Sequence, residues 1–449
     1  MQKIRRIFLI TADALRADVV DPITNKGLTP NIKKFAENAV VFTHAFANGV
    51  PTVQAFTCIF TSTYPLMHTT LKLSSFFKRL PGILQKHGFY TVAFHSTPYL
   101  SSFFGWKKGF DEFHDFLEEL KEISAQARFL FRSASWKDKL KRTLGKKLAK
   151  FPLFRALIKI RYKRRKSILP YLDGQELLQY VTEWIQKNIN KRFFMWIHFM
   201  DTHEPYAPPK PWLPKEFKDR NEARIFNHIL RNKEEAKKYV NLLKRLYEGE
   251  VRYLDFLLGK FFEFLEEKNI MEQSLIIFTS DHGDAFLEHG VLQHPSHNLY
   301  NEIVHVPLIL FDGESSGIIH QPVSHIDISP TILNFLGIKI PRNFYGKPIS
   351  MYKESKKIIY IDGIDIDFNN WVYKTRKPYV AVIDYPWKLI YCPDGHKELY
   401  NLAKDSAEKN NLVSEEPDIT YELSIMVKRH IIECKIVRRL FNNMKCIKK

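Results

Sequence analysis

The chain has 449 residues, of which 45% are hydrophobic and 14% aromatic, so a substantial core is expected and global disorder is excluded. Its formal net charge of +19 predicts attraction to polyanions such as anionic lipid surfaces, nucleic acids, or phosphorylated and sulfated substrates. Its four cysteines show no short paired spacing, which argues against a zinc cluster and a disulfide framework. No apolar run is long enough to cross a bilayer, and the first one is too short for a signal peptide, so a cytoplasmic protein with reduced thiols is expected.

The N-terminal residues predict a strand and then a helix. Residues 4–12 read as a strand, and Asp13 follows it directly. Thr29 suits the N-cap of a helix and Pro30 its first position, and residues 40–42 predict the next strand. Asp13 is therefore the first carboxylate expected at the end of a strand.

Thr52 follows a turn at residues 48–51 and begins a predicted helix that runs to about Thr61. Its hydroxyl would lie beside free backbone N–H groups and the positive end of the helix dipole. That place suits an anion and a nucleophile that attacks one. The alternative is an N-cap threonine without chemistry, which is the commoner use of such a residue.

Two further apolar runs, residues 193–199 and 275–278, predict strands buried on both faces of a parallel sheet. The second is followed closely by Asp281 and His282. Ligands of open α/β sheets bind just past the carboxyl ends of strands, so Asp13 and Asp281 can converge there on a divalent cation. A polar loop without a metal is the alternative.

The segment from about 117 to 166 interleaves basic and apolar residues at roughly helical spacing. It predicts an amphipathic helical insertion able to lie on an anionic membrane surface. A helical insert packed on its own domain with a solvated basic face is the alternative. No helix-turn-helix or single-strand-binding pattern is present, so no nucleic acid partner is expected.

The C-terminal part predicts strands at residues 357–361, 379–383 and 387–391 and a last helix at 418–441. Short polar motifs accompany these elements along most of the chain. They are Asp13-x-Leu-Arg-x-Asp18, Thr29-Pro-Asn31, Thr61-x-x-Tyr64-Pro65, His198-Phe-Met-Asp201-Thr-His203-Glu-Pro-Tyr206, Ser280-Asp-His-Gly283, Glu288-His-Gly290, Leu299-Tyr-Asn-Glu302, Val306-Pro-Leu-Ile309, His325-Ile-Asp327-Ile-Ser-Pro-Thr331 and Glu398-Leu-Tyr-Asn-Leu402.

In number, order and spacing these motifs resemble the sulfatase family of the alkaline phosphatase superfamily. The resemblance implies an α/β fold with a large domain at 1–340, whose central, mostly parallel sheet lies between helices. That domain would carry the basic insertion at about 117–170. A smaller C-terminal domain with an antiparallel sheet is expected at 341–449.

The departures from the family pattern concern the nucleophile and its neighbours. Many sulfatases carry a second aspartate where this chain has Ala14, and their nucleophile is a cysteine oxidised to formylglycine. The corresponding residue here is Thr52, so formylglycine cannot form at this position. The family's lysine segment is replaced by a segment with His95, expected either to contact substrate or to be structural. Cys58, further along the same helix, is interpreted as a buried core thiol.

The chain is therefore similar to a threonine-nucleophile branch of the superfamily. By resemblance, one divalent metal ion would be held by Asp13, Asp281, His282 and Thr52. A histidine ligand favours Mn²⁺ or Zn²⁺, with Mg²⁺ and Ca²⁺ as alternatives. Further roles implied by the resemblance are catalysis by His203 and His294 beside Thr52, and substrate contact by Asp201 and His95, whereas His198 is expected to be structural. A second metal held by Asp201, His203 and His294 is the less favoured alternative.

The sequence thus predicts a hydrolase or transferase that acts on a phosphate monoester or diester through Thr52. Phosphorus is preferred because a formylglycine hydrate can expel sulfate by collapsing to the aldehyde, whereas threonine cannot. The alternatives are a sulfatase acting on sulfate esters and, from another class, a non-catalytic membrane-associated binding protein. The basic insertion suggests an anionic or lipid-linked substrate and peripheral contact with a membrane.

Overall fold

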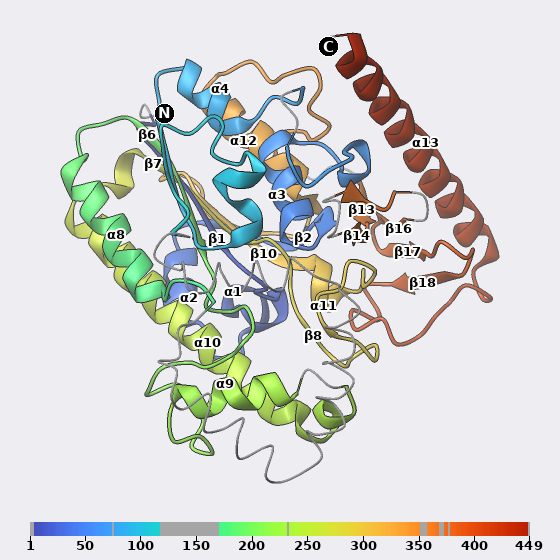
Figure 1. Cartoon of the computed structure of the whole chain (residues 1–449), viewed down its shortest axis with the longest axis horizontal. Coiled ribbons are helices and arrows are strands. Elements are labelled where there is room, and N and C mark those ends of the chain that lie inside the picture. Colours follow the sequence, from blue (N-terminus) through green and yellow to red (C-terminus); the bar gives the residue numbers. More distant parts are fainter. Residues whose placement is uncertain are drawn as a thin grey trace, which may run out of the picture.

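The structure is a computed structural model of the chain, and the residues it describes are 4–73, 76–116, 170–230, 233–350, 357–367, 372–375 and 378–447. The basic insertion predicted at about 117–170 lies outside them except for its last residue. Figure 1 shows a large sheet between helices and a smaller sheet beside it, with the C-terminal helix along the edge of the molecule.

A nine-stranded sheet forms the centre of the large domain. In spatial order its main path is β11 (Gly317–Ile319), β2 (Val40–Phe46), β10 (His305–Phe311), β7 (Ser274–Ser280), β1 (Arg6–Ala12), β6 (Phe193–Phe199), β4 (Tyr90–Phe94) and β5 (Glu112–His114), and β12 (Val323–Ser324) also pairs with β2. Only β10 runs antiparallel to its neighbours. The mostly parallel sheet is therefore confirmed, and the four predicted strands of this domain are all present.

Helices cover both faces of this sheet, as a continuous apolar strand requires. Along β1, Phe8 and Ile10 belong to the core on one face and Ile7 and Leu9 to the core on the other. The first core packs against α2 (Pro30–Ala36), α8 (Gly174–Lys187) and α10 (Lys233–Glu267), and the second against α3 (Thr52–Thr61), α4 (Leu80–Lys86) and α12 (Ile328–Phe335).

The smaller sheet is mainly antiparallel, as predicted. Its order is β18 (Lys397–Asn401), β17 (Trp387–Tyr391), β16 (Tyr379–Asp384), β13 (Ile358–Gly363) and β3 (Gly49–Val50). The short strand β3 belongs to the N-terminal part of the chain, pairs in parallel with β13, and ends two residues before Thr52. The small sheet is thereby joined to the segment that begins α3.

The C-terminal helix α13 (Pro417–Ile447) is longer than the 418–441 predicted. The remaining α-helices in the described ranges are short: α1 (Asp21–Thr24), α9 (Arg220–Ile229) and α11 (Asn301–Val304). Two small antiparallel pairs are formed by β8 (Ala285–Phe286) with β9 (Leu292–Gln293) and by β14 (Ile366–Asp367) with β15 (Val372–Tyr373). Among the described residues, none of the helices has the length and apolar character needed to span a bilayer.

Candidate active site

The ends of β1 and β7 place two carboxylates side by side. The two strands are parallel neighbours, with Ala12 opposite Ser280, so the residues that follow them, Asp13 and Asp281, emerge together at one edge of the sheet. The Asp13 N–H donates to the carbonyl of Phe199 at the end of β6, which fixes the first carboxylate between two strands. This register explains how segments far apart in sequence form one site.

Thr52 and His282 complete this group. Ligand atoms of Asp13, Asp281 and His282 all lie within 4.8 Å of one another, and all three side chains are buried. Thr52 Oγ1 lies 3.2 Å from His282 Nε2 and 3.5 Å from Asp13 Oδ2. The N-cap of α3 is Pro51, and the Thr52 hydroxyl makes no capping hydrogen bond. The geometry thus brings together the four residues predicted as metal ligands and directs the Thr52 hydroxyl toward the site.

Two carboxylate oxygens in this group have no hydrogen-bond partner among the described residues. They are Asp13 Oδ1 and Asp281 Oδ2, and they lie 3.9 and 3.5 Å from His282 Nε2. The other nitrogen of His282, Nδ1, lies 2.8 Å from the carbonyl of Gly283 and so carries the proton that it donates. Nε2 is then an unprotonated acceptor that faces the unpaired oxygens. Two carboxylates, an imidazole nitrogen and a hydroxyl form a donor set that fits a divalent cation.

The electrostatics of this group also favour a bound cation. Burial and the nearby charge of Asp13 raise the pKa of Asp281 above its ordinary value. Burial also raises the pKa of Asp13, but His203, His198 and His282 outweigh that effect, so the pKa lies below its ordinary value. Two buried carboxylates this close are costly without a positive partner, and a cation would remove that cost.

His203 and His294 lie in a row with His282. The ring centroid of His294 is 4.4 Å from that of His282 and 5.1 Å from that of His203. His203 Nδ1 lies 2.6 Å from the carbonyl of Glu204 and donates to it, so Nε2 is the ring nitrogen that takes no part in this hydrogen bond. Of the two histidines predicted to be catalytic, His294 therefore packs beside His282, the neighbour of Thr52, and His203 packs beside His294.

Asp284 holds His294 and was not predicted from the sequence. Its Oδ1 lies 3.2 Å from His294 Nδ1, and its Oδ2 accepts a hydrogen bond from the Tyr206 hydroxyl. Burial lowers the pKa of His294, but Asp284, Asp13 and Glu204 outweigh burial and raise the pKa to about 9. The carboxylates around His294 therefore favour the protonated form of its ring. The sequence feature that could have indicated Asp284 is its position directly after the motif Ser280-Asp-His-Gly283.

His198 supports Asp13. Its Nε2 lies 3.4 Å from Asp13 Oδ2, and its Nδ1 lies 3.0 Å from Thr11 Oγ1. The ring of Phe56, on α3, packs edge-on against the ring of His198 at 5.0 Å. His198, which was expected to be structural, therefore contacts a site carboxylate directly.

Asp201 and His95 are not part of the group around Thr52. Asp201 Oδ1 accepts a hydrogen bond of 3.0 Å from the N–H of Gly174, the first residue of α8. A Cβ at Gly174 would come within 2.3 Å of Asp201 Oδ2, so the carboxylate fills the space that glycine leaves. The His95 ring is fully buried and stacks on Trp196 at 4.9 Å, and burial holds its pKa well below the ordinary value. Their substrate contact stays a prediction.

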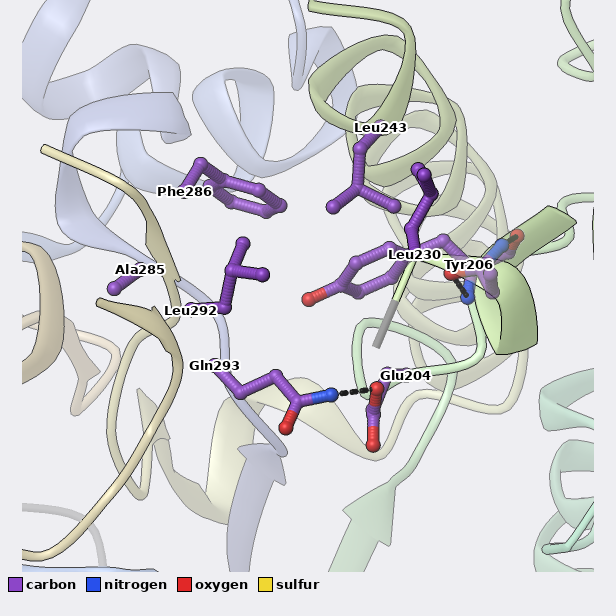
Figure 2. A pocket seen from close by; sticks show the side chains of 9 residues that line it. Glu204, Tyr206, Leu230, Leu243, Ala285, Phe286, Leu292 and Gln293 are labelled. Carbon is purple, nitrogen blue, oxygen red and sulfur yellow. Dashed lines mark hydrogen bonds between the residues drawn. The ribbon is translucent and has the colours of Figure 1, made fainter. Parts of the chain in front are cut away.

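A small cavity lies between the segment that carries Glu204 and Tyr206 and the paired strands β8 and β9 (Figure 2). Its volume is about 20 Å³, enough for about one water molecule. It is lined mainly by the apolar side chains of Leu230, Leu243, Phe286 and Leu292. At its edge the side-chain amide of Gln293 donates to Glu204. Gln293 precedes His294 and Glu204 follows His203, so this hydrogen bond ties together the two segments that carry these histidines.

A second buried group with metal-ligating side chains lies outside the active site. It consists of Asp362 on β13 with His430 and Cys434 on α13. His430 Nε2 lies 2.8 Å from Asp362 Oδ1, so the two side chains are already paired with each other. Cys58 is fully buried in α3 and its thiol donates to the carbonyl of Gln54, as expected for a core thiol.

Family comparisons agree with the fold. A profile of the sulfatase family matches residues 5–338, more than half of the chain. The chain is a member of the sulfatase family. A second profile, described as N-sulphoglucosamine sulphohydrolase, C-terminal, matches residues 287–435, so the family pattern continues through the small sheet into α13.

The named relatives match this sulfatase-family chain over only part of their own length. Arylsulfatase K of Homo sapiens is 27% identical over 207 residues, which cover 42% of this chain and 37% of the relative. Choline-sulfatase of Rhizobium meliloti (strain 1021) is 24% identical over 265 residues, 54% of this chain and 50% of the relative. Arylsulfatase of Clostridium perfringens (strain 13 / Type A) is 23% identical over 294 residues, 57% of this chain and 59% of the relative. The chain thus covers less than two thirds of each.

Solved structures match nearly the whole chain. The phosphonate monoester hydrolase of Agrobacterium radiobacter has a TM-score of 0.64 and 18% identity, covering 97% of this chain and 96% of that one. BT1596, a 2-O GAG sulfatase, has a TM-score of 0.66 and 16% identity, covering 96% of this chain and 93% of that one. At these identities the likeness establishes the fold of the sulfatase-family chain and not its substrate.

The buried carboxyl of Asp201 is expected to make the stability of this sulfatase-family protein depend on pH. Burial and the charge of Asp173 raise its pKa from 3.8 to about 7. Between pH 3.8 and about pH 7 the native state therefore holds a proton that the unfolded state has lost. The free energy of unfolding falls as the pH rises through this range. Asp201→Asn keeps an oxygen for the Gly174 N–H and removes the charge. We expect its melting temperature to exceed that of the wild type by a few degrees at pH 8 and to differ little at pH 4, as measured by thermal unfolding.

The opposite result would assign Asp201 a different role. If Asp201→Asn lowers the melting temperature at pH 8, the ionised carboxylate is stabilised by a partner such as a bound cation. That outcome would favour the less preferred alternative, in which Asp201 joins His203 and His294 at a second metal.

Proposed function

We propose that this sulfatase-family chain is a metal-dependent hydrolase of an anionic ester, with Thr52 as the nucleophile. The observation that carries the proposal is the position of the Thr52 hydroxyl, 3.2 Å from His282 Nε2 and 3.5 Å from Asp13 Oδ2 at the start of α3. An N-cap threonine would bond to its own helix instead. Thr52 is buried with its hydroxyl inside the group that includes Asp13, Asp281 and His282.

One divalent cation would be held by Asp13, Asp281, His282 and Thr52. The unpaired oxygens of Asp13 and Asp281 and the unprotonated Nε2 of His282 support this assignment. The imidazole ligand favours Mn²⁺ or Zn²⁺, with Mg²⁺ and Ca²⁺ as alternatives. When bound, the cation would neutralise charge on the transferred group and lower the pKa of the Thr52 hydroxyl.

Three residues of the site would each perform a different step of the reaction. The Thr52 hydroxyl donates its proton toward Asp13 Oδ2 as its oxygen bonds to the central sulfur or phosphorus atom, and the bond to the leaving alcohol breaks. His294, held by Asp284, donates the proton that the leaving oxygen needs. Water then attacks the central atom of the Thr52 ester and gives a proton to His294. The bond to the Thr52 oxygen breaks, and this oxygen takes back the proton held by Asp13. His203 would hydrogen-bond the transferred group through Nε2.

Sulfate is the transferred group that the relatives favour. Arylsulfatase K, choline-sulfatase and arylsulfatase are all named for sulfate esters. These names support the sulfate-ester alternative better than the phosphoester interpretation drawn from the sequence. We therefore take a sulfate ester as the first candidate substrate class.

A phosphoester is the second candidate, and residue 52 is the specific observation that favours it. The chain has threonine there, so formylglycine cannot arise from this residue. A threonine ester must be cleaved by attack at the central atom, and it cannot be relieved by collapse to an aldehyde. This route suits phosphorus, as do transfer reactions to an acceptor alcohol in place of water.

Turnover of three p-nitrophenyl compounds, the sulfate, the phosphate monoester and the bis-ester phosphate, separates these candidates. Each is assayed with Mn²⁺, Zn²⁺, Mg²⁺ and Ca²⁺ added singly to protein freed of metal by a chelator. Metal-dependent turnover led by the sulfate supports the first candidate, and turnover led by either phosphate supports the second. A protein that turns over none of the three and retains no metal would contradict the proposal and favour the non-catalytic binding protein.

A further inference from the structure

The inner face of α13 fixes how this helix is oriented. Leu423, Val427, His430 and Cys434 follow one another at spacings of four, three and four residues, and all are buried. His430 pairs with Asp362 of β13 at 2.8 Å, and its ring stacks on that of Tyr360 at 4.3 Å. These contacts hold α13 against the small sheet, and Figure 1 shows the helix along the edge of the molecule. The opposite face therefore points away from the protein.

That outer face carries an apolar stripe made of Ile432, Ile436 and Leu440. Their spacing of four residues places them one above the other on the helix. They are 56%, 52% and 58% exposed, although isoleucine and leucine are among the residues most often fully buried. A run of exposed aliphatic side chains on one helix face indicates a contact surface.

Basic side chains flank the apolar stripe. Four exposed residues, which we call the basic flank, are Lys428, Arg429, Lys435 and Arg439. Between residues 428 and 440 there are five Lys or Arg and one acidic residue, Glu433, a net charge of +4. Residues 417–427 of the same helix contain two acidic residues and no Lys or Arg. The positive charge is thus concentrated where the apolar stripe lies.

An anionic lipid surface matches both features. Amphipathic helices with basic polar faces lie in the interface of a membrane, with the apolar side chains in the acyl boundary and the basic ones at the headgroups. A second copy of this chain is a poor partner, because the net charge of +19 and the basic flank would face their own like charges. We propose that the outer face of α13 docks on anionic membranes, with the apolar stripe inserted and the basic flank on the headgroups.

Vesicle cosedimentation of the full chain tests this proposal. The vesicles are phosphatidylcholine alone and phosphatidylcholine mixed with phosphatidylserine, at low and high salt. We expect binding to the anionic vesicles to exceed binding to the neutral ones at least tenfold and to weaken with salt, since surface charge attraction is screened. The triple variant Ile432→Ser/Ile436→Ser/Leu440→Ser should lose at least tenfold in partitioning, and so should the variant with glutamine at all four basic-flank positions.

Tyr421→Ser is the matched control. Tyr421 lies on the same helix and is 68% exposed, but its neighbours are acidic and not basic. It should bind vesicles as the wild type does. Unchanged melting temperatures would show that the variants remain folded, because the substituted side chains are exposed.

Three results would overturn the proposal. The first is equal binding of the triple variant and the wild type, which would assign membrane contact to another segment, such as the basic insertion. The second is no preference of the wild type for anionic vesicles. The third is self-association of the wild type, without vesicle binding, that the triple variant abolishes, because the apolar stripe would then be a protein interface.

Discussion

Thr52→Ala is expected to reduce turnover of the preferred ester at least about 10³-fold, because it removes the nucleophile itself. The loss should fall mainly on kcat, since the hydroxyl acts in bond formation. Thr52 is buried at the first position of α3, and its hydroxyl caps no backbone group. The melting temperature should therefore change little. Mass spectrometry of acid-quenched protein should show one added sulfuryl or phosphoryl group on the wild type and none on Thr52→Ala.

Two variants of similar size separate chemistry from packing. Thr52→Ser keeps a hydroxyl and should retain activity within about tenfold of the wild type, since only the β-methyl is lost. Thr57→Ala removes a buried hydroxyl on the same helix that donates to the carbonyl of Val53 and lies outside the group around Thr52, so activity should persist. Turnover that survives in Thr52→Ala would mean that water or another side chain attacks the ester, and the threonine mechanism would be wrong.

The parts of the site that were predictable are those set by strand ends. Asp13 and Asp281 each follow an apolar run, and parallel pairing of β1 with β7 is enough to bring them together. The apolar runs could be recognised because buried parallel strands have little room for polar side chains. The turn at residues 48–51 placed Thr52 at the start of a helix. The family resemblance then supplied its role and those of His203 and His294, which lie in loops that periodicity does not place.

Side-chain direction was not predictable from the same patterns. Asp201 and His203 are two residues apart, yet one supports the start of α8 and the other faces His294. His198 ends up against Asp13 because Thr11 and Phe56 hold its ring there. Such orientations depend on partners supplied by other elements, which a single segment of sequence does not contain. The substrate contacts first assigned to Asp201 and His95 came from motif position alone.

Asp281→Asn is expected to abolish binding of the divalent cation and reduce turnover at least about 10³-fold. Asparagine can keep the Oδ1 contacts with the N–H groups of Ala14 and His282, at 3.1 and 2.8 Å, so the backbone should hold its shape. It replaces Oδ2, the oxygen that lacks a partner among the described residues and lies 3.5 Å from His282 Nε2. Metal analysis after dialysis against each cation should find about one equivalent on the wild type and none on the variant.

Stability gives this prediction a readout that does not depend on activity. Without metal, burial and Asp13 raise the pKa of Asp281 above its ordinary value, so ionisation at neutral pH destabilises the wild type, and Asp281→Asn should melt at a higher temperature in chelator. With metal at one hundred times its Kd, the wild type should gain about 2.7 kcal/mol and the variant nothing.

A buried carboxylate away from the group distinguishes loss of the site from a general effect. Asp255→Asn changes a buried residue that accepts hydrogen bonds from Asn31 and Ile32, and it should leave the metal response intact. If Asp281→Asn instead melts below the wild type in chelator and still gains stability from metal, the two carboxylates do not repel each other and the cation binds elsewhere. Asp281→Asn is thus expected to melt above the wild type without metal and below it with metal. This reversal arises only if the Asp281 carboxylate destabilises the metal-free protein and binds the cation when the metal is present.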